Sequence, residues 1–168
     1  MTQLTSHFSL EEMCFSQTAI RKGINNIPTD QATLDNLKRT ANGLERVRQH
    51  LNNNAIRVSS GYRSPLLERA ICDDAYRQWC LRRDLLVGIQ SWNEYLRGKQ
   101  HPKGQAVDFT SIYGPPALIV KSIKSSGIEY DTLALEYPGE GGWVHISFSD
   151  DPRRQTLVID SKGTRLFQ

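Results

Sequence analysis

Residues 28–61 read PTDQATLDNLKRTANGLERVRQHLNNNAIRVSSG, and they contain the clearest helical pattern of the chain, followed directly by a strand. Asparagines at positions 52–54 end the helix, and residues 55–60 alternate with the period of two that is typical of a strand. Apolar side chains recur along the helix at spacings of three or four, which places them on one face over about six turns: Leu34, Leu37, Ala41, Leu44, Val47 and Leu51.

Further elements lie on both sides of this segment. Before it, the S-L-E-E sequence that begins at Ser9 predicts a capped short helix. After it, residues 65–97 have a mostly helical composition, and Pro115 and Pro116 begin another helix. Strands are predicted at residues 105–112, 132–137, 142–149, 155–160 and 164–167. We therefore expect residues 1–168 to form a single α+β domain, in which N-terminal helices pack on a mostly antiparallel sheet.

The composition limits the kinds of partner. Lys and Arg total 21 and Asp and Glu total 18, so the formal net charge is only +3 and predicts no nucleic-acid partner. There is no apolar run of membrane-spanning length, and the first residues lack the features of a secretory signal. We expect a monomer that is synthesised in the cytoplasm without a signal peptide and has no membrane partner. The cysteines Cys14, Cys72 and Cys80 form no metal-type CxxC pair.

Two histidines and an aspartate are candidate metal ligands. His101 and Asp108 lie in HPKGQAVD, where Gly104 would let the backbone pass close to an ion. His145 lies in the apolar strand WVHIS, and burial of its nitrogens without partners would be costly. A hydrogen-bonded loop and a core histidine are the alternatives to a metal site. As ligands, the three residues would leave one of the four positions of zinc open, which is typical of catalytic sites.

A catalytic site of this kind also needs a general base, for which Glu136 is the best candidate. If the hairpin turns about residues 140–141, Glu136 and His145 are cross-strand partners and point to the same face. A one-residue change in the turn would break this register. Glu140 is the alternative base, and a solvent-facing strand carboxylate is the alternative role for Glu136. Arg63 follows a strand end in SSGYRS and could bind a carboxylate or stabilise an oxyanion.

These segments together resemble peptidase family M15, which contains zinc D-Ala-D-Ala carboxypeptidases and related phage endolysins. The matching segments are SSGYRS at 59–64, HPKGQAVD at 101–108, and LALEY with GGWVHIS at 133–147. HFSLEEMCFSQTA near the start and RRQTLVIDSKG near the end also resemble the branch of the family that is common in phage genomes. The resemblance implies a fold like that of the D-Ala-D-Ala carboxypeptidases and Hedgehog proteins.

The resemblance further implies a zinc metallopeptidase that hydrolyses the peptidoglycan stem peptide. One Zn²⁺ per chain would be bound by His101, Asp108 and His145. Arg63 would face the substrate or an intermediate, an acidic residue near the last ligand would act as base, and we expect substrate contacts from Ser60, Tyr62 and Trp143. The bond cut would be D-Ala-D-Ala or L-Ala-D-Glu. The enzyme would act on the cell wall in phage or prophage lysis, after release by a holin or delivery in a virion.

The chain departs from the family pattern at several positions. Lys99 stands where the family has serine, Glu68 stands where asparagine is common, and the segment from Arg63 to His101 is long. Residues 72–97 therefore look like a helical insertion, whose aromatic residues Trp79, Trp92 and Tyr95 would either line a groove or pack into the protein. These departures support an alternative function, namely a non-catalytic cell-wall-binding or virion structural module on the same scaffold.

Overall fold

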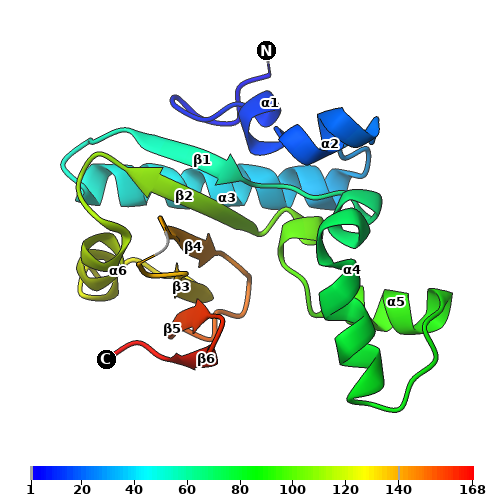
Figure 1. The fold of residues 1–168 in the computed structure, drawn as a ribbon. Coiled ribbons are helices and arrows are strands. Elements are labelled where there is room, and N and C mark those ends of the chain that lie inside the picture. The colour runs from blue at the N-terminus through cyan, green and yellow to red at the C-terminus, as the bar shows by residue number, and fades with distance from the viewer. Residues whose placement is uncertain (1, 140) are drawn as a thin grey trace.

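The computed structural model describes residues 2–139 and 141–168 of the chain (Figure 1). Helices precede most of the strands. They are α1 (Leu10–Met13), α2 (Gln17–Lys22), α3 (Gln31–His50), α4 (Pro65–Leu81), α5 (Ile89–Arg97), the 3-10 helix η1 (His101–Lys103) and α6 (Pro116–Lys124). Of these, α1, α3, α4 and α6 begin close to their predicted positions. Over the described residues, none of these helices has both the length and the apolar character needed to cross a membrane.

Six strands of the described chain form one sheet with the order β1-β2-β4-β3-β5-β6. They are β1 (Ile56–Ser60), β2 (Ala106–Ser111), β3 (Thr132–Glu136), β4 (Trp143–Ser147), β5 (Gln155–Asp160) and β6 (Gly163–Leu166). All neighbouring strands are antiparallel except β3 and β5, which run parallel. This arrangement confirms the predicted α+β class.

The main hydrophobic core joins α3 and α6 to one face of the sheet. Asp30 caps α3 by accepting a hydrogen bond from the backbone N–H of Thr33 at 2.8 Å, and the predicted apolar stripe of α3 faces inward. Because side chains alternate along a strand, the residues between the buried core positions of the sheet point to its other face. Completely buried members of the core include Leu37, Leu44, Phe109, Ile119, Ile123, Leu133 and Ile146.

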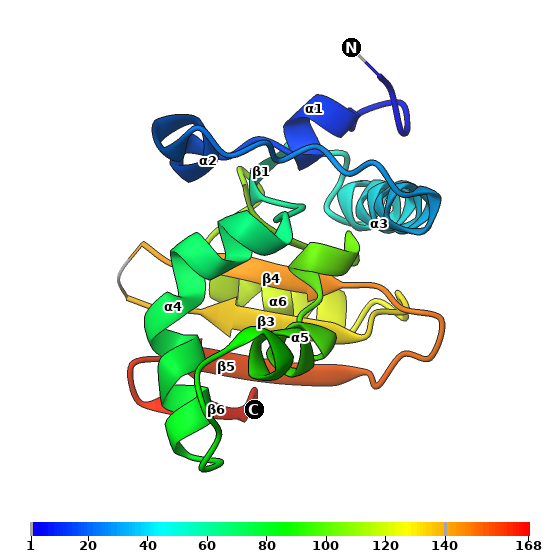
Figure 2. The same ribbon diagram turned by 90° about the vertical axis from the view of Figure 1, so that its right-hand side faces the viewer.

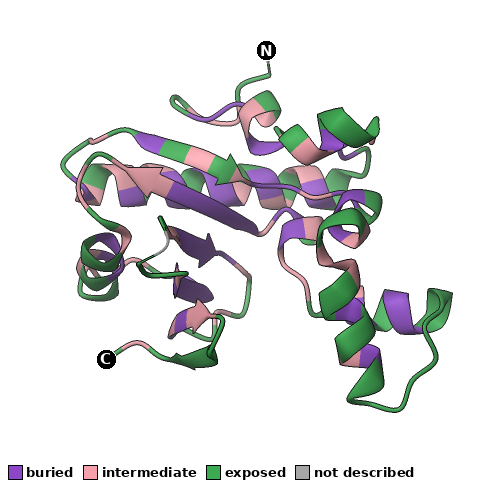
Figure 3. Cartoon of the chain, viewed as in Figure 1, coloured by how far each residue is buried: buried purple, intermediate pink, exposed green. Residues whose placement is uncertain are grey.

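Helices α4 and α5 stand in front of that other face, on the opposite side of the sheet from α6 (Figure 2). Helix α4 is kinked at Cys72, where the predicted insertion begins. Beyond the kink, residues 72–97 form a helical hairpin with a small aromatic cluster of its own, separate from the main core. Much of its surface is exposed, especially toward the tip (Figure 3).

The turn between β3 and β4 differs from the prediction. Glu136 pairs with Trp143, and His145 pairs with Ala134, so the predicted pairing of Glu136 with His145 is wrong. The turn is centred one residue earlier than expected, which moves each pairing partner by two positions. Gly142 permits this turn, because a Cβ atom there would lie 2.1 Å from the carbonyl oxygen of Glu136. A shift of two preserves the alternation, so Glu136 and His145 still point to the same face.

Candidate metal centre and its cleft

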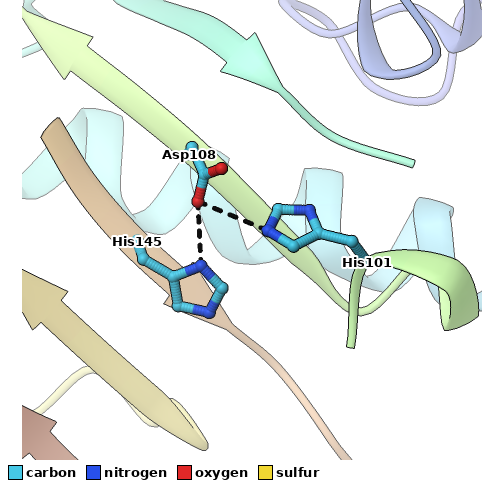
Figure 4. Close-up of side chains that lie close together, drawn as sticks. All are labelled: His101, Asp108 and His145. Carbon is cyan, nitrogen blue, oxygen red and sulfur yellow. Dashed lines mark hydrogen bonds and ion pairs between the residues drawn. The ribbon is translucent and has the colours of Figure 1, made fainter. Parts of the chain in front are cut away.

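Three separate elements bring the predicted metal ligands together. His101 lies at the start of η1, Asp108 on β2 and His145 on the neighbouring strand β4 (Figure 4). Strand pairing places Asp108 directly opposite His145, so both side chains point to the same face of the sheet. All three residues are buried. The sequence predicted the identity of these residues, and the sheet register explains how residues far apart in the chain meet.

The ligand atoms of this trio converge on one point. Nδ1 of His145 lies 2.8 Å from Oδ1 of Asp108, and Nε2 of His101 lies 3.4 Å from the same oxygen. One ligand atom from each of the three residues lies within 4.8 Å of the other two. Imidazole lone pairs and a carboxylate oxygen repel one another unless a proton or a cation lies between them. The buried trio can therefore hold a metal ion.

The second nitrogen of His101 supports this interpretation. Nδ1 of His101 lies 2.7 Å from the carbonyl oxygen of Gly61, which fixes that nitrogen as the donor and leaves Nε2 to face Asp108. Metal-binding histidines commonly donate their other ring N–H to a backbone carbonyl, because this orients the ring and makes the ligand nitrogen more basic.

Contacts with α3 hold the loop that carries His101. The hydroxyl of Thr40 donates to the carbonyl of Gly104 at 2.8 Å, and the amide of Asn36 donates to the carbonyl of Lys103 at 2.9 Å. Gly104 has φ +69°, and a Cβ atom there would lie 2.9 Å from the carbonyl oxygen of Thr33. We expected Gly104 to approach an ion. The structure shows close packing of Gly104 against α3, and the approach to an ion stays a prediction.

Arg63 lies between two buried carboxylates. Its Nη2 donates to Oδ2 of Asp108 at 2.8 Å, and its Nη1 lies 3.5 Å from Oε2 of Glu68. Its Nε donates to the hydroxyl of Ser60 at 2.9 Å. Arg63 and Ser60 thus orient Asp108 on the side that faces away from the histidines.

These contacts set the charge state of Asp108. Burial by itself raises the pKa of this carboxyl group, but the charges and hydrogen bonds of His101 and His145 hold the pKa well below its ordinary value. The carboxylate form, which a cation requires as a ligand, is therefore the favoured form of Asp108.

Glu136, the predicted base, faces the same cleft as the trio. Burial, together with the negative charge of Asp108, raises the pKa of Glu136 above its ordinary value. Trp143 pairs directly with Glu136 across the strands, and its ring packs at 5.4 Å from that of Tyr137. Glu140, the alternative base, lies outside the described residues.

Tyr62 does not lie where the predicted substrate contact requires. It is buried in the main core at 6% exposure, and it does not line the cleft. Ser60 is half-buried and holds Arg63, as described above. The SSGYRS segment therefore contributes mainly structure: the tyrosine anchors the loop in the core, and the serine and arginine support the ligand aspartate.

The cleft beside the trio has a volume of about 360 Å³. Its floor is the sheet face opposite the core, because its strand residues are the alternate ones of β2, β4, β3 and β5. Its wall comes from the start of α4 and the loop before η1. Sequence patterns marked Glu68 and Lys99 only as unusual positions, and no motif indicated a role for Gln100 or Arg153. The lining residues that the sequence analysis did not assign to a site include Glu68, Cys72, Lys99, Gln100, Thr132, Arg153, Leu157 and Ile159.

Comparison with known proteins gives one family match. Residues 6–75 match the family model described as Peptidase M15. No curated protein matches the chain. The match supports the family that the motifs predicted, and it supports peptidase activity. It covers Ser60, Arg63 and Glu68 but ends before His101, so the convergence of the metal trio is an independent observation from the geometry.

Proposed function

We propose that this chain, whose residues 6–75 match the Peptidase M15 family model, is a zinc-dependent peptidase that hydrolyses the stem peptide of peptidoglycan. The observation that carries the proposal is a single cleft that contains both a trio of converging metal-type ligands and a separate carboxylate, Glu136. A purely structural metal site would be closed by a fourth protein ligand and would need no free carboxylate beside it.

Zinc suits this donor set. Two imidazole nitrogens and one carboxylate oxygen are ligands that zinc accepts, and three protein ligands leave a position open in its tetrahedral coordination. His101 would bind through Nε2, because Gly61 accepts a hydrogen bond from its Nδ1. When bound, zinc would supply Lewis-acid polarisation of the scissile carbonyl group.

The residues of the chain would carry out the proton transfers and the positioning. The carboxylate of Glu136 accepts a proton from the attacking water and delivers it to the leaving amine nitrogen. Arg63 holds Asp108 in place through Nη2 and lines the cleft beside the substrate. Trp143 lies next to Glu136 on the neighbouring strand.

The choice of peptidoglycan as substrate rests on the motif resemblance described above, and the bond would be D-Ala-D-Ala or L-Ala-D-Glu. The protein would act on the cell wall, which it would reach after release by a holin or as part of a virion. The proposal keeps the chain a monomer.

Digestion of purified peptidoglycan tests the proposal. The zinc-loaded protein should release new amines, and mass spectrometry of the muropeptides should show either loss of the terminal alanine or separation of the stem peptide at L-Ala-D-Glu. A chelator should stop the release, and zinc should restore it. A protein that sediments with the wall but produces no new amine with zinc present would favour the non-catalytic binding module instead.

A further inference from the structure

The cleft extends well beyond the metal trio, across the sheet toward β5. His145 on β4 pairs with Ala134 on β3, which in turn pairs with Leu157 on β5. Neighbouring strands lie roughly 4.8 Å apart, so β5 lies roughly 10 Å from β4. Arg153 lies just before β5, four residues before Leu157, which adds at most roughly 13 Å along the strand direction. The far end of the cleft is therefore roughly 12–16 Å from the trio, which an extended peptide spans with about four residues.

A buried aspartate organises this far end. Asp131 accepts hydrogen bonds from Nε of Arg153 at 2.9 Å and from Nη2 of Arg153 at 2.6 Å. The side-chain amide of Gln100 also donates to Asp131. Gln100 follows Lys99 directly, so one carboxylate fixes both the guanidinium of Arg153 and the loop that carries Lys99.

Lys99 and Arg153 keep donors that no protein acceptor uses. Within residues 2–139 and 141–168, Lys99 has no carboxylate partner, and its ammonium group lies 4.3 Å from the ring centre of Tyr95. Over the same residues, Nη1 of Arg153 has no hydrogen-bond partner, although Nε and Nη2 are occupied. The third cation of the cleft, Arg63, differs because each of its three nitrogens already has a partner, namely Ser60, Glu68 or Asp108.

The distribution of charge favours a particular ligand. The carboxylates Asp108, Glu68 and Glu136 line the same cleft as the cations Lys99 and Arg153. Strand pairing places Arg153, just before β5, on the side of the cleft away from the trio. A carboxylate, with one negative charge and two acceptor oxygens, matches the donors that remain free, the Lys99 ammonium group and Nη1 of Arg153. A guanidinium and an ammonium group are well matched to a carboxylate.

We propose that Lys99 and Arg153 form a carboxylate-binding subsite, which selects peptides that carry a free carboxylate about four residues from the scissile bond. The inference rests on the proposed peptidase function and names the part of the substrate that this end of the cleft recognises. Tyr95 belongs to the aromatic cluster of the helical hairpin, so the hairpin, which lines the cleft only through Cys72, contributes to specificity by supporting Lys99.

A pair of synthetic stem peptides tests the subsite. The two peptides differ only in whether the carboxyl group about four residues from the scissile bond is free or amidated. For the free acid, Lys99→Gln should raise KM roughly tenfold or more, since a hydrogen bond to a charged group is lost. kcat should stay unchanged, because the interaction is made equally in the ground and transition states. For the amide, KM should be the same for the wild type and the variant.

Two further variants complete the experiment. Arg153→Lys keeps the charge that Asp131 needs but removes the planar fork, and it should raise KM for the free acid only. Lys162→Gln, at an exposed turn outside the cleft, is the matched control and should leave KM unchanged for both peptides. An equal rise in KM for both peptides, or no rise for either, would overturn the subsite.

Equilibrium binding separates failure of the subsite from failure of the proposed function. Calorimetry with zinc-loaded Glu136→Gln protein measures the affinity for both peptides without turnover. The subsite is supported if the protein binds the free acid more tightly than the amide and the Lys99→Gln substitution abolishes this preference. This holds even if the wild type cleaves neither peptide and the peptidase proposal fails. Cleavage of both peptides by the wild type, without a preference in binding or KM, leaves the peptidase proposal intact and rejects the subsite.

Discussion

The body of the protein, which is the sheet with the helices packed on it, and the helical hairpin of residues 72–97 are stabilised by different kinds of contact. In the body, polar and charged residues from distant segments are buried and bonded to one another, as in the contacts of Asp108 with His145 and Arg63. In the hairpin, four neighbouring side chains form a closed aromatic cluster, and the tip exposes several large apolar side chains. The exposed residues are Leu81, Leu85, Leu86, Val87 and Ile89.

This difference indicates which substitutions should affect which property. Geometry in the body depends on pairing between distant segments, so changes there should alter metal binding and chemistry. The hairpin packs mainly on itself, with Tyr76 and Trp92 in an edge-to-face contact at 5.0 Å between ring centres. Changes within it should alter local stability and leave the metal trio intact.

The largest effect is expected from His145→Ala. This substitution removes a ligand and also one hydrogen-bond partner of buried Asp108, which costs about 1–3 kcal/mol of stability. Metal content should fall from close to one equivalent to less than a tenth, and activity should be lost. Elemental analysis and a peptidoglycan digest measure the two effects. A variant that still holds a full equivalent of zinc would show that the trio is not the metal site.

Glu136→Gln should separate chemistry from metal binding within the body. The amide keeps the shape of the side chain but cannot accept the proton, so the rate should fall by roughly 10²–10⁴-fold while zinc content stays unchanged. Turnover by this variant at the wild-type rate would place the base elsewhere, and Glu140→Gln would then be the next variant to measure.

Trp92→Ala tests the independence of the hairpin. Trp92 is 7% exposed and packs on Tyr76 and Tyr95, so its truncation should destabilise the hairpin by about 3–5 kcal/mol. Zinc content should remain at the wild-type value. Thermal unfolding and elemental analysis of the same preparation provide the comparison. Loss of zinc in this variant would show that the hairpin and the body form one cooperative unit.

The smallest effect concerns acid stability of the body. Hydrogen bonds from Arg153, which outweigh the opposing effect of burial, hold the pKa of Asp131 below its ordinary value. A carboxyl group whose pKa is lowered by folding stabilises the folded state at pH values above its unfolded-state pKa of about 3.9. This stabilisation is lost as the pH falls toward the folded-state pKa.

Asp131→Asn should therefore be less stable than the wild type near neutrality. The difference in stability between the two proteins should become smaller as the pH falls below about 4. Melting temperatures of both proteins between neutral pH and strongly acidic pH measure this change. A difference in melting temperature that stays constant over the whole pH range would mean that the ionisation of Asp131 does not stabilise the fold.

Local signals in the sequence were sufficient for much of the fold. The stripe from Leu34 to Leu51 predicted α3, and Ser9 and Asp30 cap their helices as the side-chain chemistry requires. The three metal-type residues could also be predicted, because a histidine in an apolar strand is costly without a partner. The position of the β3–β4 turn could not, since alternation identifies the face of each side chain but not the pairing partner.

By itself, the sequence determined the α+β class, the long helix and the identity of the metal-type trio. These features depend on periodicity and residue chemistry within short segments. Only the tertiary structure decided that Arg63 lies between Asp108 and Glu68, that Tyr62 and Trp92 are buried, and that Gln100 and Arg153 meet at Asp131. These features depend on contacts between segments distant in the chain, whose register and packing no local pattern specifies.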